Sequence, residues 1–190
     1  MRVGDIVYFS PSHKFIDLKW DSKEYLVSAF RDRVEGFYLT PAQQLNDAGQ
    51  AFASGVLCVT TVDFLARIQT GEEKVKKRIK KWLVDNIPAF AEPDPQNQQR
   101  TLALRFYEEF RNGLVHEGRI KNGGQFSYDY ENLIEVQGPV MIVNPSILLE
   151  EISEAFDHYL EEILSDEFIF QSFRCALLDC FRTDMDIARM

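Results

Sequence analysis

Apolar side chains recur every three or four residues along most of this 190-residue chain. That spacing places them on one face of a helix, and helices with such stripes bury them by packing against one another. The pattern predicts helices over about residues 22–39, 41–68 and 72–87, a helix that begins near Gln98, and helices over about 145–164 and 166–181. We therefore expect a mainly α fold, a helical bundle.

Local signals set the expected ends of the second helix. Pro41 suits its first turn, and Gly71 is a good stop signal after it. Gly49 and Gly55 lie inside it and mark either close packing or a bend, because glycine destabilises a helix interior by up to ~1 kcal/mol. At roughly 28 residues, this helix would be ~42 Å long.

The remaining segments lack helical periodicity. Residues 3–9 predict a short strand, and the polar residues 91–99, which contain two prolines, predict a loop. Residues 121–124 predict a turn. The alternation in residues 126–143, interrupted by a Gly-Pro pair, predicts a small β-hairpin inserted after the preceding helix.

A single domain is expected over residues 1–190, because a chain of this length can bury one substantial core. The proline-containing loop separates helices, and nothing in it indicates a domain boundary. Residues 1–20 would form an N-terminal extension, and residues 22–182 would form the bundle.

The formal net charge of −9 argues against a surface that grips nucleic acid over its whole extent. Phosphate binding draws on Lys and Arg, so any contact with nucleic acid has to be local. The one strongly basic patch is on the predicted helix 72–87, opposite its apolar face. It is either a solvated helix face or a strip that contacts RNA phosphates through Lys74, Lys77, Arg78 and Lys81.

Cysteine usage and hydropathy indicate the compartment. Cys58, Cys175 and Cys180 form no Cys-x-x-Cys pair and are odd in number, which favours three buried thiols in a reducing compartment over disulfides or zinc. The apolar run at the N-terminus is too short for a signal peptide, and no stretch reaches ~18 uninterrupted apolar residues. We expect a cytoplasmic protein without membrane contact.

The stretch from Arg111 to His116, with the sequence Arg-Asn-Gly-Leu-Val-His, carries the most plausible chemistry of the chain. An arginine is always charged and presents a planar fork of donors that fits phosphate oxygens. A histidine titrates near neutrality and can move a proton to or from a ribose hydroxyl. Asn112 can donate or accept a hydrogen bond and so orient either partner. The combination suits the handling of a phosphodiester.

Helix geometry limits how this pair can act. Residues five apart on an ideal helix differ by ~140° around the axis and ~7.5 Å along it, so Arg111 and His116 would not share a face. Either Gly113 lets the helix distort between them, or a second copy of the chain completes the site. The second option makes a homodimer part of the mechanism.

This stretch resembles the Arg-Asn-x-x-x-His form of the motif of the HEPN superfamily (higher eukaryotes and prokaryotes nucleotide-binding). The resemblance extends to the layout of residues 22–182: a long helix pair, a helix that delivers the motif, a short β insertion and closing helices. It implies a HEPN-like helical bundle, and many such proteins are metal-independent endoribonucleases of toxin-antitoxin and defence systems in which two motifs meet across a dimer.

Carried onto this chain, the resemblance makes Arg111 the phosphate-stabilising residue, His116 the acid-base residue and Asn112 the polar residue that follows the arginine. In one subgroup of HEPN toxins a modified tyrosine follows the histidine by two positions. That position here is Gly118. The departure makes regulation by a partner nucleotidyltransferase doubtful.

Other candidates have weaker support. Arg119 and Lys121 follow the motif and are expected to contact RNA, and Tyr128 could stack on a base, although strand alternation explains it equally well. Glu154 and His158 lie one helical turn apart, but metal sites in bundles need several such pairs, so we expect no metal and no cofactor.

Three functions remain open from the sequence. The leading hypothesis is a metal-independent endoribonuclease that cleaves single-stranded RNA by attack of the 2'-hydroxyl, with an antitoxin or defence-complex protein as a further partner. The second is a non-catalytic HEPN-like module that binds a protein or a nucleotide. The third is a structural helical domain whose motif is coincidental.

Overall fold

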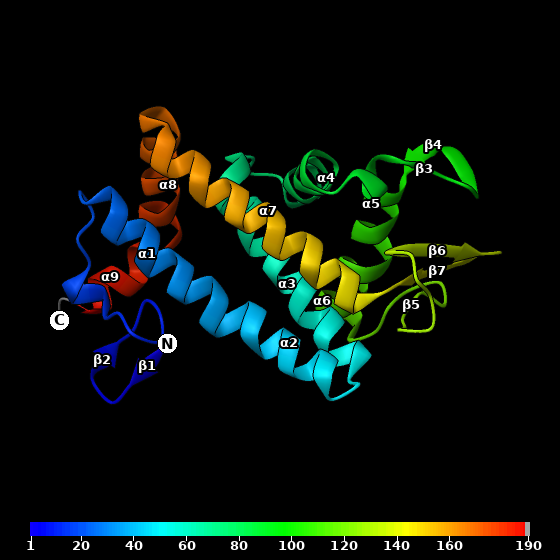
Figure 1. Ribbon diagram of the computed structural model, residues 1–190, viewed down its shortest axis with the longest axis horizontal. Coiled ribbons are helices and arrows are strands. Elements are labelled where there is room, and N and C mark those ends of the chain that lie inside the picture. The colour runs from blue at the N-terminus through cyan, green and yellow to red at the C-terminus, as the bar shows by residue number, and fades with distance from the viewer. Residues whose placement is uncertain (189–190) are drawn as a thin grey trace.

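The computed structural model describes residues 1–188 of the chain and is mainly helical, as the apolar periodicity predicts (Figure 1). Its helices are α1 (Lys23–Val34), α2 (Thr40–Asp47), α3 (Ala51–Thr70), α4 (Val75–Asn86), α5 (Leu102–Phe106), α6 (Asn112–Glu117), α7 (Pro145–Ser165), α8 (Glu167–Cys180) and α9 (Arg182–Ala188). Its π turns are η2 (Glu35–Leu39) and η4 (Tyr107–Arg111), and its 3-10 turns are η1 (Phe15–Asp17) and η3 (Pro88–Ala91).

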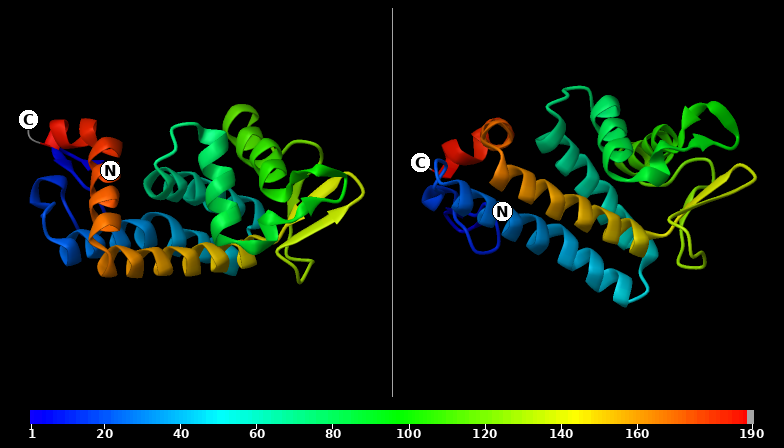
Figure 2. Two further views of the ribbon diagram at one scale, coloured as in Figure 1. Left: turned by 90° about the horizontal axis from the view of Figure 1, so that it is seen from above. Right: turned by 45° about the horizontal axis from the view of Figure 1, so that its top comes forward.

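Helix α3 is the central element, because α2, α4, α7 and α8 all pack against it. Helix α7 runs alongside α1 and α2 in the opposite direction, and α4 to α6 cover the other side of α3 (Figures 1 and 2). By length and apolar composition alone α3 could cross a membrane, although half of that window is buried inside the structure. Burial among neighbouring helices accounts for its apolar sequence.

A cluster of aromatic rings joins four of these helices. The ring of Phe30 on α1 lies 6.0 Å from that of Phe64 on α3, 5.6 Å from Phe156 on α7 and 5.0 Å from Phe173 on α8, measured between centroids. Tilted and edge-on contacts of this kind add to the stabilisation that the buried aromatic area already provides. The apolar stripes therefore meet in one core, as the bundle prediction requires.

The boundary between the first two predicted helices is wrong. The chain stays helical from α1 through η2 into α2, and it breaks only at Ala48–Gln50, where Gly49 has a φ of +69°. Pro41 cannot donate to the preceding turn, and the wider π turn directly before it absorbs that loss without ending the rod. Gly71 ends α3 with a φ of +64°, which confirms it as the stop signal.

Gly55 explains the second glycine of this region. A Cβ atom at Gly55 would overlap the ring of Phe126, which packs directly on the α3 backbone. Gly49 is thus the bend and Gly55 the close contact. The sequence allowed either a bend or close packing at each glycine, and the structure assigns one role to each.

The β elements are small hairpins and one mixed sheet. Strands β1 (Arg2–Val3) and β2 (Ile6–Val7) pair where a single strand was expected, and β3 (Pro93–Asp94) and β4 (Asn97–Thr101) pair inside the predicted loop. The hairpin predicted after the motif is confirmed as β6 (Ile134–Gln137) and β7 (Val140–Val143), and β5 (Gln125–Phe126) pairs parallel to β7. These strands lie at the end of the molecule that carries the motif helix (Figure 1).

Two further expectations need correction. The motif helix begins at Leu102 and not near Gln98, because the side chain of Thr101 caps it by accepting a hydrogen bond from the Leu104 N–H. The cysteines are not all buried: Cys58 is buried, but Cys175 is exposed. The helix start was predicted four residues too early, and helix ends are the part of a helix that periodicity locates least well. The exposure of Cys175 depends on how the helices pack, which periodicity does not report either.

Candidate functional site

The motif lies on a helix with an irregular middle. Helix α5 runs into the π turn η4, which ends at Arg111, and α6 then continues as regular α-helix to Glu117. Gly118 ends it with a φ of +65°, a conformation that glycine adopts at little cost. Helix termination therefore accounts for the glycine two positions after His116.

Arg111 is held by an aspartate on the central helix. Its Nε and Nη2 atoms donate to the same oxygen of Asp63, at 3.1 and 2.7 Å. Arg78 of α4 donates to the other oxygen of that carboxylate at 2.8 Å. The side chains of Arg78, Arg111 and Asp63 are 14, 15 and 21% exposed, so the group is largely buried yet still open to solvent. One carboxylate thus orients two guanidinium groups.

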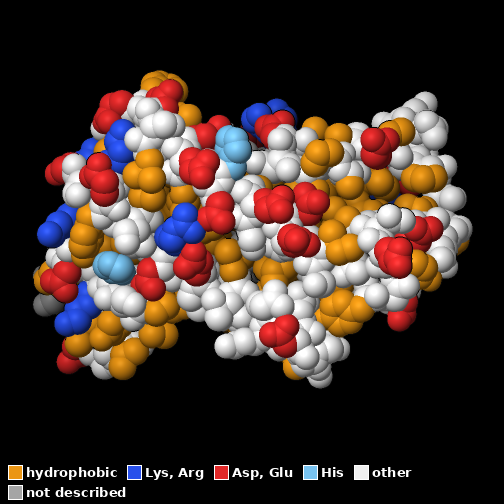
Figure 3. All heavy atoms as spheres, viewed as in Figure 1, with side chains coloured by type: hydrophobic (Ala, Val, Ile, Leu, Met, Phe, Trp, Pro, Cys, Tyr) orange, Lys and Arg blue, Asp and Glu red, His pale blue; other side chains and the backbone are white. Residues whose placement is uncertain are grey.

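These three side chains line a hollow of about 260 Å³ together with Arg67, Thr60 and Val115. Three arginines against one aspartate give its lining a surplus of positive charge. The protein as a whole has a net charge of −9, and acidic side chains are spread over the face displayed in Figure 3. A hollow with this surplus of arginine charge can attract a phosphate group even on an acidic protein.

His116 does not reach this hollow within one chain. It follows Arg111 on a regular helical stretch, it is exposed, and its side chain makes no hydrogen bond or ion pair with residues 1–188. The lining residue of α6 is Val115, one turn after Arg111 and 58% exposed. The structure therefore separates the arginine from the histidine, as ideal helix geometry predicts.

The idea that Gly113 distorts the helix between Arg111 and His116 is wrong. The distortion lies before Arg111, in η4. Gly113 serves close packing: a Cβ atom there would overlap the carbonyl oxygen of Arg119, where the chain folds back over the helix. Asn112 is partly buried, and its Oδ1 atom has no hydrogen-bond partner within the described residues.

The predicted basic strip of α4 divides into two parts. Arg78 turns into the hollow, whereas Lys74 and Lys77 are exposed and make no ion pair within residues 1–188. Lys81 pairs with Asp85 one turn along the helix. The strip contributes one arginine to the hollow and leaves Lys74 and Lys77 solvated beside it.

The predicted RNA-binding residues after the motif have partners within the chain. Arg119 and Lys121 both pair with Glu117, each at 2.7 Å. The hydrogen bond from Lys121, followed by the charges of both cations, holds the pKa of Glu117 below its usual range. The hydroxyl of Tyr128 donates to Asn46 at 2.9 Å, and burial raises the pKa of Tyr128.

Sequence reasoning missed Asp63 and Arg67. A signal for both exists, because they are the only charged residues in the apolar sequence of α3 and lie one turn apart. A charge in the middle of an apolar helix usually has a partner. Glu109 lies two residues before Arg111 but pairs with Arg105, at 3.0 Å.

Arg105 is the centre of a buried ionic network behind the site. Only 1% exposed, it donates to Asp94 at 3.2 Å, to Glu109 and to the carbonyl oxygen of Pro139. Arg100 donates to the other oxygen of Asp94. The network ties the motif helix to the β3–β4 hairpin and to the β6–β7 turn, and so it fixes the helix that carries Arg111.

The other two histidines are unsuited to the same role. Ser10 and Asp32 both approach Nδ1 of His13, at 2.8 and 3.2 Å, whereas a catalytic triad places its nucleophile and its acid at opposite ring nitrogens. His158 faces Glu162 at 3.8 Å rather than Glu154. Within residues 1–188, no group of three or more His, Cys, Asp or Glu side chains is arranged to hold a metal ion.

Comparison with known proteins gives no family assignment. No family model, no curated protein and no solved structure matches this chain significantly.

Proposed function

We propose that this protein is a metal-independent endoribonuclease of the HEPN type that acts on single-stranded RNA as a homodimer. The observation that carries the proposal is the positive hollow in which Asp63 orients Arg111 and Arg78. The motif stretch from Arg111 to His116 supports the same function. An antitoxin or defence-complex protein is a further expected partner.

In this mechanism Arg111 binds the scissile phosphate and stabilises the charge that grows on it during in-line attack. A histidine takes the proton of the ribose 2'-hydroxyl, whose oxygen forms a bond to phosphorus. The bond from phosphorus to the 5'-oxygen breaks, and that oxygen receives a proton. The products are a 2',3'-cyclic phosphate and a 5'-hydroxyl, and no water is consumed.

The histidine would come from a second copy of the chain. His116 is exposed and does not line the hollow of its own chain, while Val115 offers exposed apolar surface at the edge of that hollow. In a two-fold dimer each copy presents the same surface to the other, so two α6 helices that meet would exchange their His116 side chains. Each hollow would then hold one arginine of its own and one histidine of its partner.

The test is cleavage of single-stranded RNA in EDTA by the wild type, Arg111→Ala, His116→Ala and the matched control His158→Ala, which changes another exposed histidine. We expect both motif variants to lose activity and the control to keep it. Equal cleavage by the wild type and His116→Ala would refute the proposal. Detection of a 2',3'-cyclic phosphate end identifies the reaction.

Mixing Arg111→Ala with His116→Ala tests the composite site directly. Half of the dimers that form at random are mixed, and each mixed dimer holds one complete site of two, so about a quarter of wild-type activity should return. If each site were contained within one chain, the mixture of the two variants would regain no cleavage activity.

The Asp63–Arg111 ion pair favours a second candidate function. A guanidinium already bound by a carboxylate suits reversible binding of an anion or of a partner protein without cleavage. A protein that binds RNA in the same assay, cleaves none of it and loses binding in Arg111→Ala would be such a binding module.

A further inference from the structure

The Arg111 hollow carries more positive charge than one phosphodiester neutralises. Its lining holds three arginines, Arg67, Arg78 and Arg111, against the single carboxylate of Asp63, which leaves a surplus of two positive charges. The other titratable group of the lining is the Cys180 thiol, and because burial raises its pKa, it stays neutral. A phosphodiester carries one negative charge. The charge of the hollow therefore matches an anion with two negative charges.

The three guanidinium groups keep unused donors. Arg111 donates to Asp63 from Nε and Nη2, and Arg78 donates to it from Nη2 alone. The Nε atom of Arg78 is buried and has no hydrogen-bond partner within residues 1–188. Arg67 is exposed, and its side chain makes no hydrogen bond or ion pair with those residues. Since a guanidinium group has five N–H donors, most donors of the three groups remain unpaired.

The rest of the lining limits the size and character of a ligand. The hollow has a volume of about 260 Å³, which is below the ~300–1,000 Å³ of sites that enclose a drug-sized molecule. Val59, Phe64 and Val115 add an apolar wall beside the arginines. A phosphate group joined to one small ring suits this space.

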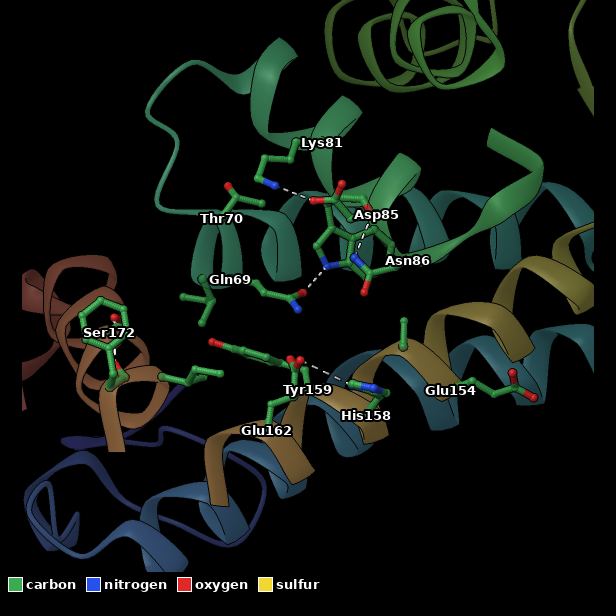
Figure 4. A pocket seen from close by; sticks show the side chains of 15 residues that line it. Gln69, Thr70, Lys81, Asp85, Asn86, Glu154, His158, Tyr159, Glu162 and Ser172 are labelled. Atoms are coloured by element: carbon green, nitrogen blue, oxygen red, sulfur yellow. Dashed lines mark hydrogen bonds and ion pairs between the residues drawn. The ribbon is translucent and has the colours of Figure 1, made fainter. Parts of the chain in front are cut away.

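A larger cavity between α3, α4, α7 and α8 has the opposite charge (Figure 4). It is lined by the carboxylates of Asp85, Glu154 and Glu162. Its lysine, Lys81, pairs with Asp85, and its histidine, His158, faces Glu162. Because such a lining repels phosphates, an anionic ligand should prefer the smaller hollow.

We propose that the Arg111 hollow binds a phosphate monoester and that this ligand competes with RNA. A monoester carries a charge of about −1.5 to −2 at pH 7 and has three terminal oxygens that accept hydrogen bonds. It matches the surplus charge and the unpaired donors better than a phosphodiester, which offers one charge and two terminal oxygens. Binding of the monoester is independent of the proposed ribonuclease activity, whereas its inhibition of RNA cleavage rests on that proposed function.

The test compares three ligands that carry the same ring: phenyl phosphate, phenyl sulfate and methyl phenyl phosphate. Phenyl sulfate has three terminal oxygens but a single charge, and methyl phenyl phosphate has a single charge and two such oxygens. Calorimetry slightly above neutral pH should show saturable one-to-one binding of phenyl phosphate. Its Kd should be about tenfold lower than that of either singly charged ligand.

The variant Arg67→Gln tests whether the surplus charge makes this difference. It should reduce the preference for phenyl phosphate over phenyl sulfate from about tenfold to about threefold. Its Tm should not fall, because the side chain has no partner in residues 1–188. The matched control is Arg2→Gln, which removes an equal charge from an exposed arginine of β1 that does not line the hollow. This control should keep the wild-type preference.

Phosphate monoesters occur both at the ends of RNA strands and in small molecules. Two 2'-O-methyl RNAs that differ only in a 5'-phosphate distinguish these sources. Tighter binding of the phosphorylated strand would assign the site to strand ends, and equal binding would assign it to small esters.

Three outcomes of the binding experiments would overturn the inference. They are equal affinities for phenyl phosphate and phenyl sulfate, equal preferences in Arg67→Gln and Arg2→Gln, and no saturable binding of phenyl phosphate. In the RNA assay phenyl phosphate should inhibit with a Ki equal to its Kd, and cleavage that it does not inhibit would overturn the competition. A protein that binds phenyl phosphate and cleaves no RNA would disprove the ribonuclease alone, so the two failures are separate results.

Discussion

Replacing Asp63 by asparagine should make the protein less stable and yet bind RNA more tightly. The substitution keeps the shape of the side chain and removes the charge that pairs with Arg111 at 2.7 Å and with Arg78 at 2.8 Å. These pairs are largely but not fully buried, so their joint loss should lower the free energy of unfolding by about 1–2 kcal/mol. For a chain of this size that is a fall of about 2–8 °C in Tm.

The gain in RNA binding follows from Coulomb's law. A phosphate bound by the fork of Arg111 would have its charge about 6 Å from the Asp63 carboxylate. Their repulsion is about 3 kcal/mol at an effective dielectric constant of about 20 and below 1 kcal/mol in water. Because the site is partly exposed, removing this repulsion should strengthen RNA binding by about 1–2 kcal/mol. That corresponds to a roughly fivefold to thirtyfold lower Kd.

The assay is binding of an RNA with 2'-O-methyl groups, which cannot be cleaved, together with thermal unfolding of the same samples. The control is Asp47→Asn, which changes the net charge equally at an exposed residue of α2 whose side chain accepts a hydrogen bond from Gln43. We expect the control to alter neither quantity appreciably. Cleavage of ordinary RNA should slow in Asp63→Asn, because Arg111 loses the carboxylate that orients it.

Weaker RNA binding by Asp63→Asn than by the control would refute this reasoning. It would mean that the phosphate does not bind next to Arg111, or that Asp63 itself contacts the RNA. Unchanged stability would show that the ion pairs contribute nothing measurable.

Three further predictions concern the scaffold behind the site. Arg105→Met should lower the free energy of unfolding by about 3–5 kcal/mol in urea titrations, because it removes the buried cation shared by the carboxylates of Asp94 and Glu109. Burial alone would raise the pKa of Asp94, but hydrogen bonds from the backbone N–H of Gln96 and from Arg100 hold it below its usual range. The stabilisation that follows is present above about pH 4 and is lost as the pH falls through the lowered pKa, so urea midpoints measured from pH 7 to pH 3 should fall less steeply in Asp94→Asn. Gly113→Ala should cost about 1–3 kcal/mol in the same titration, because its Cβ would overlap a backbone oxygen.

The sequence predicted the long helices because their information is local. Helices α7 and α8 each combine a regular apolar stripe with a capping side chain, Asn144 and Asp166 respectively, and both appear within a residue or two of the expected bounds. The hairpin after the motif follows equally from alternation around a turn at Gly138.

What the sequence did not predict depends on contacts between distant segments. Pro41 looked like a helix start because the π turn that accommodates it cannot be read from periodicity. The role of Gly113 depends on a carbonyl group six residues later in a folded-back loop. The partner of Arg111 is 48 residues away on a helix whose apolar stripe gave no reason to single out Asp63.

The composition of the hollow bears on both proposed functions. Its arginines can bind and stabilise a phosphate, but none of its lining side chains within the described residues is a histidine. Asp63 is occupied by two guanidinium groups, and burial raises the pKa of Cys180, so neither is a ready base at neutral pH. In the proposed ribonuclease the general base would therefore come from outside the hollow, and it would be His116 of a second copy. If light scattering shows a strict monomer whose RNA affinity depends on Arg111, the protein is a binding module. If it is the ribonuclease, cleavage should appear only at protein concentrations at which the dimer forms.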